Sequence, residues 1–226
     1  MGITLTSYAH NRLRELNKLK ETGGPVVTIS REFGCPAKPI TKELIAKINK
    51  THRNKWKWVS KEIMHESAKE LGTPPSEIKY FFKYNEQGML DGILNTQSKF
   101  YISDRKVYNT IRKVIKTIGL SGNTVIVGRG GAAICNDIDN SIHIRLIAPL
   151  EWRTKMIMEF YHLDKNKATE FIKNYDLKRK KFMDHFQKTD NKQALFDIIY
   201  NCARFSKQEI VNSVYSLLKD RGILKS

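Results

Sequence analysis

Short apolar runs alternate along the chain with longer segments in which apolar residues recur every three or four positions. The run VVTIS at 26–30 is β-branched and nearly continuous, as is TVIV at 124–127. Such runs are typical of strands that are buried on both faces of a parallel sheet. Between them, Ile40, Leu44 and Ile48 mark the apolar side of a helix. This alternation predicts an α/β fold, with a mostly parallel sheet and helices on both faces.

Patterns of the same two kinds predict the remaining elements. Strands are expected at 56–59, 141–148 and 197–201. Helices are expected at 8–21, 39–49, 60–72, 103–119, 149–162, 165–185 and 206–221, the last capped by Ser206. The segment 77–100 has no clear period and contains two glycines, so we interpret it as a mobile cover segment. We therefore expect an N-terminal helical extension at 1–25 and one α/β domain at 26–226.

Composition narrows the class of protein. An apolar content of 40% is enough for an ordinary core, which argues against global disorder. No run approaches the roughly 20 apolar residues that a membrane helix needs, and the first residues do not resemble a secretory signal, so a cytoplasmic protein is expected. The three cysteines, Cys35, Cys135 and Cys202, form no CxxC pair, which indicates a reducing compartment without structural zinc.

The charge is strongly positive. Lys and Arg number 40 against 23 Asp and Glu, which gives a formal net charge of +17 and a field that attracts anions. Two basic segments, 38–61 and 173–181, lie far apart in the sequence. They suit a cleft that closes on phosphates, although solvated helix faces would look the same. The charge alone does not distinguish a nucleotide from a nucleic acid as the partner.

The segment REFGCPAKP follows the first buried strand and precedes a helix, which is where a phosphate-binding loop would stand. If Lys38 takes the lysine place of GxxxxGK, then Glu32 and Ala37 replace the two glycines. Pro39 replaces the Ser or Thr that would hold magnesium. The strict motif is therefore absent, and an ordinary βα turn without a ligand is the alternative.

Pro36 and Pro39 also remove two backbone N–H groups from this segment. The residues left to bind a polyphosphate are Gly34, Cys35, Ala37, Lys38, Ile40 and Thr41.

Ligands of an open parallel sheet bind beyond the carboxyl ends of its strands, and here those ends carry SREFG, GRGG and NCAR. We expect Arg31, Gly128, Arg129 and Gly130 to form an anion-binding part of one cleft. The forked guanidinium of Arg129 suits bidentate binding of a phosphate group. Capping of loop carbonyls is the alternative role of Arg129.

Several segments in matching order resemble the cytidylate kinase-like family. They are VTISREFG at 27–34, VIVGRGG at 125–131 and IRLIAPLEWR at 144–153. DLKRKKF at 176–182 is similar to that family's lid helix, and DIIYN at 197–201 to its last strand. Five ordered segments are more specific than any one of them, and the resemblance covers nearly everything from Val26 onward.

The resemblance implies a three-layer P-loop nucleoside monophosphate kinase fold with a helical lid at about 150–190. It also implies ATP as phosphoryl donor, Mg²⁺, and CMP, dCMP or a related monophosphate as acceptor. CPAK at 35–38 departs from the family's GSGGR-like loop, and Gly130 stands where cytidylate kinases carry Asp. A catalytically weak nucleotide-binding sensor and a nucleic-acid-binding protein therefore stay open as alternatives.

Phosphoryl transfer depends on positioning two anions and neutralising the charge that develops between them. In this interpretation, Lys38 binds the donor phosphates, Arg31 and Arg129 bind the acceptor, and a closing lid supplies Arg153, Arg179 and Lys180. Asp176 would orient Arg179 or Lys180 from a neighbouring helical position, as a plain surface ion pair also would. No side chain is assigned as a metal ligand.

Overall fold

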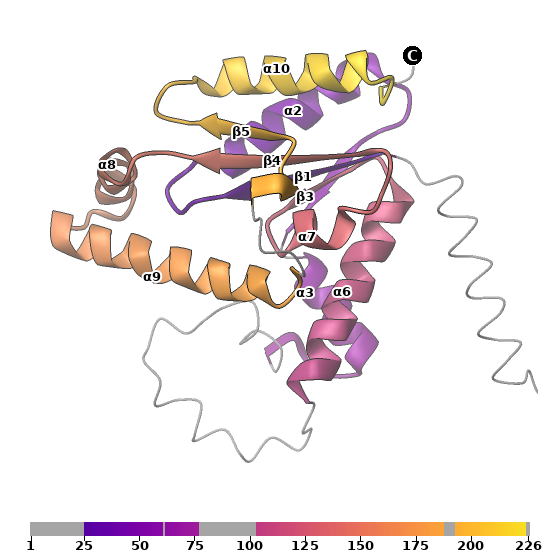
Figure 1. Cartoon of the computed structure of the whole chain (residues 1–226), viewed down its shortest axis with the longest axis horizontal. Helices are drawn as coiled ribbons and strands as arrows, with labels where there is room; N and C mark the ends of the chain where they lie inside the picture. Colours follow the sequence, from indigo (N-terminus) through magenta and orange to yellow (C-terminus); the bar gives the residue numbers. More distant parts are fainter. Residues whose placement is uncertain (1–24, 61, 77–102, 188–192, 225–226) are drawn as a thin grey trace, which may run out of the picture.

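The computed structural model describes residues 25–60, 62–76, 103–187 and 193–224 (Figure 1). Its centre is a five-stranded sheet in the order β2-β3-β1-β4-β5, and every neighbouring pair is parallel. The strands are β1 (Val26–Arg31), β2 (Lys57–Val59), β3 (Thr124–Val127), β4 (Ser141–Ile147) and β5 (Ile198–Asn201). The predictions of a parallel sheet and of a central first strand are confirmed.

Helices cover both faces of this sheet and one end of it. They are α2 (Ala37–Thr51), α3 (Glu62–Leu71), α6 (Asp104–Ser121), α7 (Gly131–Cys135), α8 (Leu150–Tyr161), α9 (Lys165–Asp184) and α10 (Lys207–Asp220), with a 3₁₀ turn at Gln193–Leu195. Figure 1 shows α2 and α10 on one face, α3, α6 and α7 toward the other, and α8 beyond the end of β4. The expected three-layer arrangement is therefore present.

The two faces of β1 pack into different cores. Val27 and Ile29 belong to the cluster formed with α2 and α10, and both are at most 1% exposed. Val26 belongs to the cluster formed with α3 and α6, and it is fully buried. A strand with apolar side chains on both faces is stable only in the middle of such a sandwich, which explains its central place.

The ends of the elements follow local signals. Ser206 Oγ accepts a hydrogen bond from Glu209 N at 3.3 Å, and the Glu209 carboxylate accepts one from Ser206 N at 2.8 Å. This capping box confirms the predicted start of α10. The short helix α7 was not expected, because five residues are too few to show a helical period. The helix predicted at 8–21 and the cover segment predicted at 77–100 lie outside the described residues.

A polar group is buried in the middle of the sheet. His143 Nδ1 lies 2.8 Å from Thr28 Oγ1, and its Nε2 lies 3.0 Å from Ser141 Oγ. Burial lowers the pKa of His143, and the nearby Asp197 opposes that shift. Both ring nitrogens are therefore satisfied by hydroxyl groups while the ring is held toward its neutral form.

No helix within the described part of the chain is long and apolar enough to cross a membrane.

Candidate functional site

Three arginines from separate segments converge beyond the carboxyl ends of the central strands, and we call them the arginine cluster: Arg31, Arg129 and Arg179. Arg31 ends β1, Arg129 follows β3, and Arg179 belongs to α9. Arg179 Nη1 donates a hydrogen bond to Arg31 O at 3.3 Å. The structure therefore brings Arg31 and Arg129, at two strand ends, together with Arg179 of α9.

The arginine cluster concentrates positive charge in a half-buried place. Burial, followed by repulsion from Arg179 and Arg129, lowers the pKa of Arg31 to about 9. Burial and repulsion from Arg179 lower the pKa of Arg129 to about 10, while Glu62 opposes the shift. Burial likewise lowers the pKa of Arg179. An anion bound here would offset this cost of charging, which is the electrostatic property expected of a phosphate site.

The turn that carries Arg129 has an unusual backbone. Gly128, Arg129 and Gly130 have φ values of 72°, 58° and 72°, so three consecutive residues are left-handed. The turn is fixed by Gly128 N donating to Ile29 O at 2.9 Å and by Gly131 N donating to Gly128 O at 3.0 Å. A non-glycine residue in this conformation costs about 1–2 kcal/mol. Strain of this kind is concentrated at functional sites, which supports a binding role for Arg129.

The loop after β1 does not have the form that the sequence suggested. Cys35 N donates to Glu32 O at 3.3 Å, and Ala37 N donates to Cys35 O at 2.9 Å. Ile40 N donates to Pro36 O at 3.2 Å. These three amides were expected to bind a polyphosphate, but the loop itself occupies them. The predicted set of phosphate donors is therefore too large for this conformation.

The remaining predicted donors are Thr41, Gly34 and Lys38. Thr41 is buried, and its hydroxyl donates to Ala37 O at 2.7 Å. Among the residues that the structure describes, the amides of Gly34 and Lys38 have no hydrogen-bond acceptor. The Lys38 side chain is exposed in the first turn of α2, and no hydrogen bond or ion pair within the described ranges links it to the arginine cluster.

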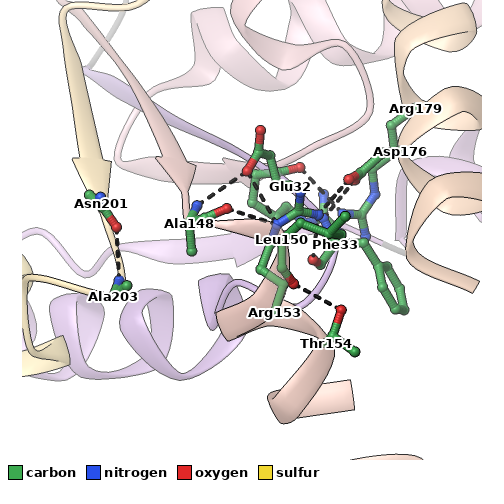
Figure 2. A network of polar contacts seen from close by, with 11 residues as sticks. Glu32, Phe33, Ala148, Leu150, Arg153, Thr154, Asp176, Arg179, Asn201 and Ala203 are labelled. Carbon is green, nitrogen blue, oxygen red and sulfur yellow. Dashed lines mark hydrogen bonds and ion pairs between the residues drawn. The ribbon is translucent and has the colours of Figure 1, made fainter. Parts of the chain in front are cut away.

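Arg153 does not lie where a lid cation was expected. It is only 8% exposed, and it joins three segments at once (Figure 2). Its Nε donates to Ala148 O at 2.9 Å, and its Nη1 donates to Phe33 O at 3.2 Å and to Asp176 Oδ2 at 2.6 Å. The Nε also lies 3.4 Å from Glu32 Oε2. The guanidinium therefore binds other groups of the protein. In this conformation it does not extend toward a donor phosphate, as it would as a lid cation.

Asp176 has partners other than those predicted. Its Oδ1 accepts a hydrogen bond from Phe33 N at 2.7 Å, while its Oδ2 binds Arg153. Its charge still favours the protonated form of Arg179 and so partly offsets the lowering of that pKa by burial. Lys180, which follows Arg179, is exposed. Arg179 is thus the predicted lid cation that the structure places in the arginine cluster.

No sequence pattern indicated a role for Glu32 or Phe33. The Phe33 ring stacks on Tyr175 with a centroid distance of 4.5 Å, and the Arg179 guanidinium lies 5.0 Å from the same ring. Glu32 Oε2 accepts a hydrogen bond from Ala148 N at 3.2 Å in addition to its ion pair with Arg153. The available signal was an aromatic residue beside a glycine in a loop. Helical and strand periodicity do not apply to loop residues, so they could not indicate this role.

The described residues do not provide a metal centre. They contain no group of three or more His, Cys, Asp and Glu side chains suited to a metal. The two nearby carboxylates, Glu32 and Asp176, already bind Arg153 and a backbone amide each. Pro39 has no hydroxyl to offer at the start of α2. These side chains therefore do not fit a protein-held Mg²⁺, which needs oxygen ligands.

Comparison with known proteins gives the arrangement a context. The model of the Cytidylate kinase-like family matches residues 26–203. A curated cytidylate kinase from Staphylothermus marinus is 30% identical over 102 residues, which cover 44% of this chain and 56% of that protein. The matched segment thus spans little more than half the length of that relative.

One solved structure supports the fold. An uncharacterized protein from Eubacterium ventriosum has a TM-score of 0.63 at 20% identity, and the match covers 87% of this chain and 98% of that one. A shikimate kinase from Bacteroides thetaiotaomicron has a TM-score of 0.49 at 13% identity, and the match covers 86% of this chain and 98% of that one.

Proposed function

The chain belongs to the cytidylate kinase-like family, and on that basis we propose that it is an ATP-dependent nucleoside monophosphate kinase. The acceptor we propose is CMP, dCMP or a related monophosphate. The observation that carries the proposal is the arginine cluster, in which Arg31, Arg129 and Arg179 repel one another beyond the ends of β1 and β3. A phosphate group is the ligand that best matches several forked cations in a poorly solvated place.

The proposed reaction uses these residues mainly for positioning and charge. An oxygen of the acceptor monophosphate attacks the γ-phosphorus of ATP, the bond to the β–γ bridging oxygen breaks, and ADP leaves with that oxygen. Arg31 and Arg129 hold the acceptor phosphate, while Gly128 and Gly130 allow the backbone turn that presents Arg129. Arg179, from the lid, contacts the same acceptor phosphate and also neutralises charge that develops during transfer.

Binding of ATP at the donor side of the site requires a conformational change in the loop after β1. We propose that the amides of Gly34 and Lys38 and the ammonium group of Lys38 contact the donor phosphates, and that Lys180 is a further cation on the closing lid. The amides of Cys35 and Ala37 become available only if their hydrogen bonds within the loop break. Any Mg²⁺ would arrive with the triphosphate, because the nearby carboxylates are engaged by Arg153.

A second function is favoured by the same loop. Because Cys35, Ala37 and Ile40 already use their amides, the chain could bind a monophosphate through the arginine cluster without binding ATP productively. It would then act as a nucleotide sensor. The third function, nucleic-acid binding, rests on the charge of +17, and the arginine cluster does not require it.

The proposed location is the cytoplasm. The proposed units remain an N-terminal extension at 1–25 and a domain at 26–226 with a lid at about 150–190.

A transfer assay tests the kinase proposal. Purified protein is incubated with ATP, Mg²⁺ and CMP, dCMP, UMP or AMP in turn, and the diphosphate is quantified. We expect product with a cytidine acceptor, and Arg179→Ala should lower kcat by on the order of 10³-fold. Lys165→Ala, a change of an exposed lysine at the start of the same helix, is the matched control. No product with any acceptor, together with thermal stabilisation by CMP, would favour the sensor instead.

A further inference from the structure

Arg153 is the centre of a buried polar network that has no assigned part in the proposed reaction. Its guanidinium binds the carbonyl groups of Ala148 and Phe33 and the carboxylates of Asp176 and Glu32 (Figure 2). These partners belong to the end of β4, to the loop after β1 and to α9. A buried charge with this many partners fixes those three segments relative to one another, because removing any partner leaves the charge poorly satisfied.

The loop approaches α8 closely at this point. Gly34 has a φ of 95°, and a Cβ on it would lie 3.1 Å from Arg153 Cβ. A glycine therefore permits both the turn of the loop and its contact with the helix. The close packing explains why the Phe33 carbonyl reaches Arg153 directly.

Asp176 uses its two oxygens for two different purposes. Oδ2 binds Arg153 at 2.6 Å, and Oδ1 accepts the backbone N–H of Phe33 at 2.7 Å. One carboxylate of α9 thus holds both the buried arginine and the loop. This attachment lies three residues before Arg179, so it fixes the turn of the helix from which Arg179 extends.

Phe33 carries the attachment on to Arg179. Its ring stacks on Tyr175 at a centroid distance of 4.5 Å, and the guanidinium of Arg179 lies 5.0 Å from the centroid of the same ring. A guanidinium over an aromatic face is held by cation–π attraction. The Nη1 of Arg179 then reaches Arg31 O at 3.3 Å. A continuous set of contacts therefore runs from Arg153 through Asp176 and Phe33 to the arginine cluster.

We propose that Arg153 and Asp176 are positioning residues that hold Arg179 in the arginine cluster by fixing α9 and the Phe33 ring against the loop after β1. The inference rests on the proposed function. It assigns the two residues a role through Arg179, without contact with either nucleotide. Loss of the ion pair between Arg153 and Asp176 should leave the fold intact and should displace Arg179 from the arginine cluster.

A double-mutant cycle between Asp176 and Arg179 tests the proposal. Asp176→Asn retains an oxygen for Phe33 N and removes the charge that faces Arg153, so it is a mild change. CMP affinity by calorimetry and kcat for transfer are measured for wild type, Asp176→Asn, Arg179→Ala and the double variant. Asp176→Asn alone should weaken CMP binding by on the order of 10-fold, the loss typical of a hydrogen bond to a charged group. In the Arg179→Ala background, the same change should have almost no further effect.

A control cycle pairs Asp176→Asn with Lys165→Ala, a change of an exposed lysine at the far end of the same helix, for which the two effects should simply add. Arg153→Lys, which keeps the charge without the fork, should show the same dependence on Arg179 as Asp176→Asn. Equal effects of Asp176→Asn in the wild-type and Arg179→Ala backgrounds would overturn the proposal and leave a structural role.

The outcomes also separate this inference from the proposed function. CMP binding with the expected coupling but without phosphoryl transfer would support the positioning role and contradict the kinase. Transfer without coupling would support the kinase and overturn the positioning role. A wild-type chain that neither binds CMP nor transfers phosphoryl groups would overturn both.

Discussion

The guanidinium of Arg31 occupies the space that a side chain at position 128 would need. A Cβ on Gly128 would lie 2.1 Å from Arg31 Nη1, and Gly128 has a φ of 72°. The glycine therefore suits the left-handed backbone and also leaves the arginine the space it occupies. This relationship links the turn after β3 to the cation that ends β1.

Gly128→Ala should therefore reduce both stability and anion binding. The backbone cost is about 1 kcal/mol, and the methyl group should displace the Arg31 guanidinium from its place beside Arg129. Chemical denaturation would measure the first effect, and calorimetry with CMP the second, for which we expect on the order of a 10-fold loss.

Gly72→Ala is the matched control for this change. Gly72 has a φ of 64°, but a Cβ there would meet nothing within 4 Å. The control should lose a similar amount of stability and keep its affinity for CMP. If Gly72→Ala weakened CMP binding as much as Gly128→Ala, displacement of Arg31 would not be the cause.

Replacement of Arg129 by glycine should stabilise the fold and weaken CMP binding. With a φ of 58°, Arg129 is strained, and glycine would relieve that strain. Arg129→Gly should be more stable than Arg129→Ala by about 1 kcal/mol, since alanine keeps the strain. Both variants should lose CMP affinity to the same extent. Paired denaturation and calorimetry measurements check this, and an alanine variant as stable as the glycine variant would argue against strain at this turn.

The buried His143 should make stability depend on pH. Burial lowers its pKa in the folded protein, so the unfolded chain binds more protons at mildly acidic pH. The stability that comes from neutral His143 is present at high pH and is lost as the pH falls through about 6.5, the pKa of an unperturbed histidine. Its share of the slope is at most about 1.4 kcal/mol per pH unit.

The check is the free energy of unfolding at pH 7.5 and pH 5.5 for wild type and for His143→Gln. The variant should be less stable at pH 7.5, because the ring and its contacts with Thr28 and Ser141 are changed. It should also lose less stability on acidification. Identical losses in the two proteins would assign the pH dependence to other groups.

The extent of what sequence reasoning can predict is clear from β1 and Arg153. The central place of β1 follows from its own composition, because consecutive β-branched residues such as Val26 and Val27 are stable only with a core on each side. The environment of Arg153 depends on carbonyls and carboxylates elsewhere in the chain. Phe33, one of its partners, is 120 residues away. An amphipathic pattern cannot distinguish a buried arginine from a lid cation.

The same contrast separates the strand-end arginines from the phosphate loop. Arg31 and Arg129 were identified because the ends of parallel strands meet at one edge of the sheet. In the loop after β1, two short hydrogen-bonded turns use the amides of Cys35 and Ala37. The residue pattern of CPAK does not specify these turns. Sequence therefore indicated that Arg31 and Arg129 lie close together, but it did not indicate the conformation of the loop after β1.

The measurement that tests the central claim most directly compares CMP with cytidine as ligands of the purified chain in calorimetric titrations. If the arginine cluster holds the phosphate of the acceptor, CMP should bind at least about 10-fold more tightly than cytidine. Replacing Arg129 or Arg179 by alanine should remove most of that difference, while Lys165→Ala should preserve it. Equal affinities for CMP and cytidine, or a preference for CMP that survives both arginine substitutions, would contradict the account.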